Sequence, residues 1–115
     1  MSKNKEEWLL SKVMIRNFAI NKLFLSLFDG DFTKAIILSR YHYFFLKNNN
    51  NPIAYNDEFF TKQYYFTQEN IYKAKKQLEE EGFIQITLKK GKEIIRVNSD
   101  FILEKIKEKC GEIAA

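Results

Sequence analysis

Apolar residues recur at helical spacing through the first half of the chain. From Asn17 to Phe28 they stand three and four positions apart, which predicts a helix over about 17–28. After the Asp29-Gly30 break a second apolar pattern runs to Leu46, and Asp31 stands where an N-cap accepts from backbone N–H groups that have no partner inside the helix. The second helix is apolar on most sides, so we expect it at the centre of the fold. The first fifteen residues can add another short helix, because they carry Trp8, Leu9 and Val13.

The pattern is interrupted by the polar run Asn48 to Asn51, which indicates a loop before Pro52. Residues 52–55 are too few for a helix and predict a brief strand. A short helix follows, carrying Phe59, Phe60 and Tyr64, and either Asn56 or Asp57 can cap it.

The clearest helix lies between Thr67, an N-cap residue type, and Gly82, which can adopt the left-handed conformation that ends helices. After Gly82 the period changes from helical to twofold. Residues 83–88 and 93–97 are rich in β-formers and are separated by Lys89-Lys90-Gly91-Lys92, which predicts a hairpin with a basic tip. A final helix is expected over about 101–110, capped by Ser99 or Asp100.

The size and composition fit one compact domain. A chain of 115 residues with 45% hydrophobic residues buries one core, so we expect a single domain over 1–115. The single cysteine cannot form an internal disulfide, and the sequence has neither a secretory signal pattern nor an apolar run of the roughly 20 residues that span a bilayer. These features predict a cytoplasmic protein without membrane association. The net charge of +4 suits an anionic partner.

Catalysis is not expected, because the residues that it needs are missing. The chain has one histidine, His42, and one cysteine, Cys110, and it lacks a glycine-rich phosphate loop. His42 lies on an apolar stripe and is expected in the core. We therefore expect no enzyme activity, metal site, cofactor or small-molecule ligand.

The order of elements is that of a winged helix, a helix-turn-helix extended by a β-hairpin. Residues 67–84 resemble the recognition-helix signature of winged-helix DNA-binding domains, a Thr or Ser cap followed by a helix ending in Leu-Glu-x-x-Gly-hydrophobic-Ile. Residues 34–45 are similar to the first helix of replication-initiator and related phage or plasmid winged-helix proteins. The resemblance covers roughly 20–97 and implies an α+β, mainly α fold: an N-terminal helical extension over 1–30, a winged-helix core with a two-stranded wing over 31–98, and a C-terminal helix over 99–115.

The resemblance also implies a set of DNA-contacting residues. In the recognition helix these are Thr67, Gln68, Asn70, Tyr72, Lys73 and Lys76. In the wing they are Lys89, Lys90, Lys92 and Arg96. Gln68 and Asn70 can pair with adenine, Lys73 can donate to guanine or phosphate, and wing cations suit phosphates. The segment 82–98 holds four basic residues and one acidic residue, so most of the net charge lies there.

The leading hypothesis is binding of double-stranded DNA, as a transcriptional regulator or a replication accessory of a phage-like or plasmid-like element. A homodimer is expected, through Trp8, Leu9 and Val13 and the C-terminal apolar side. That side consists of Phe101, Ile102, Ile106 and Ile113.

The alternative is a winged-helix protein-interaction module, which Glu69 and the acidic run Glu79 to Glu81 favour. The acidic run is expected to pair with Lys75, Lys76 and Gln77, one turn earlier on the helix. A third hypothesis is single-strand binding through exposed aromatic rings. Core packing is the preferred interpretation of the aromatic residues Tyr41, Tyr43, Phe44, Phe45, Phe59, Phe60, Tyr64, Tyr65 and Phe66.

Overall fold

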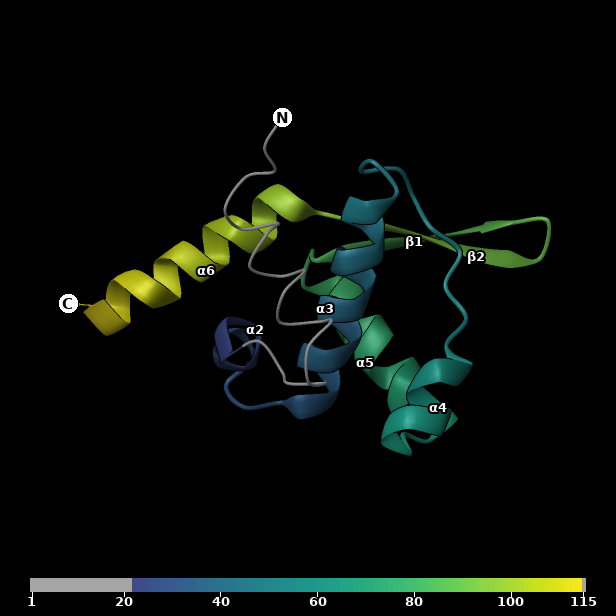
Figure 1. Ribbon diagram of the computed structural model, residues 1–115, viewed down its shortest axis with the longest axis horizontal. Helices are drawn as coiled ribbons and strands as arrows, with labels where there is room; N and C mark the ends of the chain where they lie inside the picture. The colour runs from purple at the N-terminus through teal and green to yellow at the C-terminus, as the bar shows by residue number, and fades with distance from the viewer. Residues whose placement is uncertain (1–21, 115) are drawn as a thin grey trace.

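The computed structural model describes residues 22–114, and side chains within 23–109. The elements follow one another as α2 (Lys22–Leu27), α3 (Phe32–Lys47), α4 (Glu58–Tyr64), α5 (Gln68–Glu80), β1 (Ile84–Lys89), β2 (Lys92–Val97) and α6 (Ser99–Ala114) (Figure 1). The expected mainly α fold, with a two-stranded hairpin after the helices and a helix at the C-terminal end, is confirmed. The helix expected before residue 22, with Trp8, Leu9 and Val13, lies outside the described residues.

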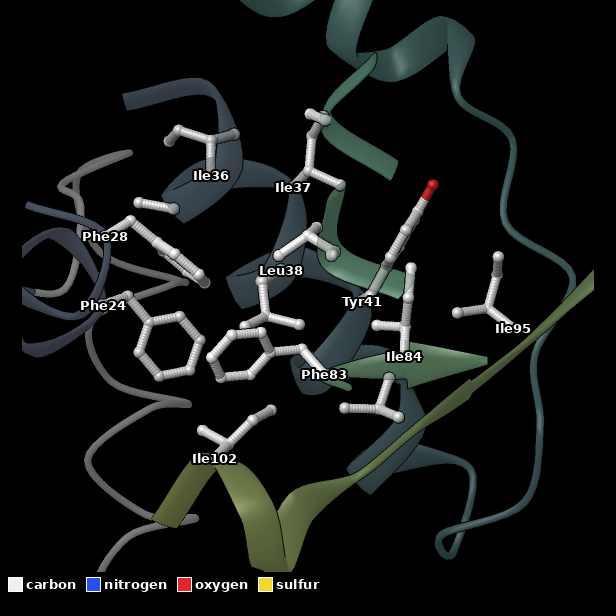
Figure 2. Packing of buried hydrophobic residues seen from close by; sticks show 14 of the residues in the cluster. Phe24, Phe28, Ile36, Ile37, Leu38, Tyr41, Phe83, Ile84, Ile95 and Ile102 are labelled. Carbon is white, nitrogen blue, oxygen red and sulfur yellow. The ribbon is translucent and has the colours of Figure 1, made fainter. Parts of the chain in front are cut away.

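Helix α3 forms the centre of the molecule, as its pattern predicts. The Asp31 carboxylate accepts a hydrogen bond from the backbone N–H of Lys34 at 3.1 Å, which confirms the expected cap. Ile37, Leu38 and Tyr41 are fully buried. Figure 2 shows α3 residues between the aromatic side chains of Phe24 and Phe28 and the hairpin residues Ile84 and Ile95. One helix therefore carries the core to which the other elements are attached.

Strand pairing in the hairpin extends closer to the turn than in the predicted strands, 83–88 and 93–97. Ile84 pairs with Val97, and the ladder continues to a pair between Lys89 and Lys92. The turn is therefore the dipeptide Lys90-Gly91, and both residues have positive φ angles, 51° and 79°. Two-residue turns of this kind match the right-handed twist of the strands, so pairing extends into the basic tip.

The segment before α4 joins this hairpin. The N–H of Ile53 donates to the carbonyl of Ile95 at 2.9 Å, and the N–H of Ile95 donates to the carbonyl of Ile53 at 2.6 Å. This bridge confirms the extended conformation expected around residues 52–55. It also holds the segment before α4 against β2.

The signals at both ends of α5 are confirmed. The Thr67 hydroxyl accepts from the N–H of Asn70 at 3.0 Å. Gly82 has a φ angle of 95°, and beyond it the N–H of Phe83 donates to the carbonyl of Leu78 at 2.9 Å. Such a bond satisfies one of the last carbonyls of the helix and turns the chain toward β1.

Of the caps of the other two helices, the one at α4 agrees with expectation and the one at α6 differs. At α4 the side chain of Asn56 accepts from the N–H of Glu58 at 3.0 Å, and Asp57 makes no cap bond. At α6 the side chain of Asn98 accepts from the N–H of Phe101 at 3.2 Å, so neither Ser99 nor Asp100 is the capping side chain. Ser99 is instead within hydrogen-bond distance of a histidine on α3, so its hydroxyl makes a tertiary contact and the neighbouring Asn98 supplies the local cap.

Part of the apolar side of helix α6 is buried inside the protein. Ile102 is fully buried, and the ring of Phe101 packs on that of Phe83 with 5.0 Å between centroids. Figure 2 places Ile102 and Phe83 next to Phe24 from α2. The expectation that Ile102 belongs to a dimer surface is therefore wrong, because the residue fills the core of its own chain.

Candidate nucleic-acid interface

One face of α5 is exposed, and it carries the predicted recognition residues. Ile71, Ala74 and Leu78 are buried against the rest of the protein. The opposite face is exposed and consists of Gln68, Glu69, Asn70, Tyr72, Lys73, Lys76 and Gln77. Tyr72 is 63% exposed, and the Lys76 ammonium lies 5.9 Å from the centroid of its ring. The structure thus brings the predicted polar side chains onto one surface of one helix, with Thr67 exposed at its start.

A buried lysine connects this helix to its neighbours. Lys75 is only 6% exposed, and its ammonium group donates to the Asp57 carboxylate at 2.7 Å and to the Glu93 carboxylate. The hydroxyl of Tyr41 donates to the other oxygen of Asp57 at 2.7 Å. Lys75, Asp57, Glu93 and Tyr41 form what we call the lysine network, which joins α5 to the start of α4, to β2 and to α3.

The charge states of the lysine network follow from its geometry. Burial disfavours the ammonium form of Lys75, but hydrogen bonds and charge attraction from Asp57 and Glu93 outweigh burial, and its pKa is raised. Burial, reinforced by the Asp57 charge, raises the pKa of Tyr41, so its hydroxyl stays a donor. A cation between two carboxylates is therefore the state of the lysine network at neutral pH.

Two grooves flank the exposed face of α5. One lies between α4, α5 and β2, and its lining includes Gln68, Tyr72 and Glu93. The other lies between the start of α3 and α5, and its lining includes Asn70 and Lys73. The predicted base-reading residues Gln68, Asn70 and Lys73 therefore lie on a ridge between the two grooves. The hairpin lies beside this ridge, because Glu93 of β2 lines the first groove.

The hairpin presents cations that have no acidic partner within the part of the chain whose side chains the structure describes. Lys89, Lys90, Lys92 and Arg96 are all exposed. None of the four forms an ion pair with another residue in the described range. The only acid of the hairpin, Glu93, is engaged by Lys75. The positive charge predicted for the wing is therefore uncompensated on its own surface.

The acidic run at the end of α5 does not pair as expected. The Glu79 carboxylate accepts from the N–H of Ile86 in β1 at 3.0 Å, and Glu81 pairs with Lys34 of α3 at 2.9 Å. The predicted pairing of this run with Lys75 and Lys76 is wrong, because carboxylates on neighbouring elements lie closer to Lys75. Glu79 and Glu81 thus attach α5 to the fold, whereas Glu80 is exposed and forms no ion pair with any residue that the structure describes.

Tyr65 is an exposed residue of this region that the sequence interpretation places in the core. It is 86% exposed and has a φ angle of 59°, whereas Phe66 beside it is buried. Core packing is confirmed for Tyr41, Phe45, Phe60 and Phe66. The sequence contains no signal for this outward turn, because a left-handed position usually holds glycine or asparagine rather than tyrosine.

The described residues contain no group of three or more His, Cys, Asp or Glu side chains that can hold a metal ion. Within the same part of the chain, no helix combines the length and the apolar character needed to cross a membrane. Comparison with models of protein families, with curated proteins and with solved structures found no match to this chain.

Proposed function

We propose that this protein binds double-stranded DNA as a winged helix, with α5 as the recognition helix and the β1–β2 hairpin as the wing. An exposed polar helix fits the major groove, which is about 12 Å wide, and a basic hairpin beside it suits the flanking backbone. The biological role that accompanies this chemistry is a transcriptional regulator or a replication accessory of a phage-like or plasmid-like element.

The observation that carries the proposal is the attachment of a basic hairpin to an exposed helix. Glu93 of the hairpin contacts Lys75 on the buried side of α5, while Lys89, Lys90 and Lys92 stay unpaired among the described residues. The hairpin and the helix therefore keep a fixed relation before any partner binds. Preorganisation of this kind lowers the ordering cost of binding.

Sequence preference would come from the exposed ridge of α5. Gln68 and Asn70 carry amides that can pair with the N6 and N7 atoms of adenine, and Lys73 can donate to guanine. Glu69 can accept from a cytosine amino group. The wing cations would bind phosphates, which position a protein without reading sequence.

A salt titration with two matched variants tests the proposal. Fluorescence anisotropy with a labelled random-sequence duplex is measured between low and physiological salt. The first variant replaces Lys89, Lys90 and Lys92 with Gln. The control replaces Lys105, Lys107 and Lys109 of α6 with Gln, which removes the same charge from another part of the molecule.

The wing variant is expected to lose affinity on all duplexes alike, with a shallower dependence on salt, because the log–log slope is about −0.9 per phosphate neutralised. The α6 variant should stay near the wild type. The proposal would be refuted if the wild-type protein shows no salt-sensitive duplex binding. Equal losses of affinity in both variants would refute the role of the wing.

A protein-interaction module is the second candidate. The exposed face of α5 carries Glu69 and Glu80 as well as Lys73 and Lys76, so its formal charges balance. A balanced face suits a protein partner, such as a component of a replication or transcription assembly, better than it suits a polyanion. This candidate would be favoured if the 260/280 nm absorbance ratio shows no co-purified nucleic acid and the titration shows no duplex binding.

A further inference from the structure

Tyr65 occupies the turn that joins α4 to α5 and faces solvent. It is the C-terminal cap of α4, with φ 59° and ψ 27°, in the left-handed region. Its neighbours face inward: the rings of Tyr64 and Phe66 stack with 5.5 Å between centroids, and Phe66 also stacks on buried Phe60. Of these consecutive aromatic residues, Tyr65 alone is directed outward, at 86% exposure.

The fold does not account for the choice of tyrosine at this position. Left-handed backbone is unfavourable for residues with a bulky side chain, and glycine or asparagine normally fills such a turn. A side chain this exposed contributes little burial in return. Strained positions that packing does not explain are concentrated at binding sites, where the strain places a side chain for a partner.

The place of Tyr65 in the chain indicates the kind of partner. Thr67, two residues later, caps the N-terminal end of α5. When the N-terminal end of a recognition helix enters the major groove, the turn before it lies along the flanking phosphates. Lys62, in the last turn of α4, is also exposed and places a positive charge near this turn.

We infer that the hydroxyl of Tyr65 donates a hydrogen bond to a backbone phosphate of bound duplex DNA, as a contact on the turn that is separate from the wing. This inference rests on the proposed function. The contact is independent of sequence, because every nucleotide presents the same phosphate oxygens. It is also neutral, so unlike a wing lysine it releases no counterion.

Two variants of Tyr65 and one matched control test the inference. Tyr65→Phe removes only the hydroxyl, and Tyr65→Gly removes the side chain and suits the left-handed backbone. Asn50→Gly is the control, because Asn50 also has a positive φ angle, 62°, in the loop after α3. Each protein is titrated with the same labelled random duplex over a range of salt, and its thermal midpoint is measured.

Tyr65→Phe and Tyr65→Gly are both expected to weaken binding about tenfold, the effect of one hydrogen bond to a charged group. The slope of log affinity against log salt should match that of the wild type, because no charge is lost. The thermal midpoint of Tyr65→Gly should be no lower than that of the wild type. Asn50→Gly should bind with unchanged affinity.

The outcomes separate this inference from the proposed function. If the wild type binds duplex and Tyr65→Phe binds equally well, the hydroxyl contact is refuted while DNA binding stands. Loss of binding in Tyr65→Gly alone would assign the effect to the ring and overturn the phosphate contact. A lower midpoint in Tyr65→Gly would indicate a structural role and also overturn the inference. Absence of wild-type binding would refute the proposed function itself.

Discussion

His42 illustrates how a single residue depends on its surroundings. It is the only histidine in the chain and lies buried on α3, with its ring stacked on Phe24 at 6.0 Å between centroids. Its Nε2 atom is 3.0 Å from the Ser99 hydroxyl, and its Nδ1 atom has no hydrogen-bond partner among the described residues. Burial lowers the pKa of His42 from 6.5 to about 4, because the imidazolium form would be desolvated.

This pKa makes stability depend on pH. The unfolded chain binds a proton near pH 6.5, whereas the folded chain resists protonation down to about pH 4. The contribution of His42 is therefore fully present above pH 6.5 and is lost as pH falls toward 4, by about 3 kcal/mol in the free energy of unfolding. Urea unfolding at pH 7 and pH 4.5 should show a smaller acid loss for His42→Gln than for the wild type. Equal losses in the two proteins would contradict this prediction.

At the scale of elements, α5 is attached to the fold by polar contacts on three sides. Lys75 reaches α4 and β2, Glu79 accepts from the backbone of β1, and Glu81 pairs with Lys34 of α3. Such contacts are directional, so they define how the helix is rotated as well as where it lies. The rotation determines which face of α5 a partner meets.

Lys75→Met tests this attachment. The variant leaves the Asp57 and Glu93 carboxylates close together without their cation, and we expect a loss of about 1–3 kcal/mol in the free energy of unfolding. Lys76→Met is the matched control, because Lys76 is exposed and the change of charge is the same. The control should stay within about 0.5 kcal/mol of the wild type in urea unfolding. Similar losses in both variants would show that the lysine network does not stabilise the attachment.

At the scale of the whole molecule, the hairpin extends from one side of the body and α6 from the other (Figure 1). The hairpin carries cations that form no ion pair with the described residues, whereas Ile102 of α6 is part of the core. A single DNA-binding module of this size buries roughly 600–1,000 Å² of protein surface, which seldom gives high specific affinity alone. We therefore propose that two copies act together on one DNA site.

Sedimentation velocity of the protein with a duplex selected from a random library tests this proposal. We expect two chains per duplex at saturation and a pair of half-sites about 10 base pairs apart, or a multiple of that spacing. Because Ile102 is buried, substitutions on the exposed part of α6 are the informative ones for the interface. Saturation at one chain per duplex would contradict the dimer.

Local patterns predict much of the fold. The N-cap role of Asp31 and Thr67, the left-handed Gly82 and the hairpin around Gly91 all follow from interactions between residues close in sequence. Such interactions act in any short segment of the chain, so they can be read without knowing the tertiary structure. The predicted exposed residues of α5 follow in the same way from helical spacing.

The sequence alone therefore determined the elements, their order, and which residues of α5 and of the hairpin tip face outward. Tertiary structure decided the partners of Lys75, Glu79, Glu81 and Ser99 and the exposure of Tyr65. Each of these depends on groups from other elements or on how a turn is packed. A charged side chain pairs with the nearest suitable group in space, and that distance exists only once the helices have packed around α3.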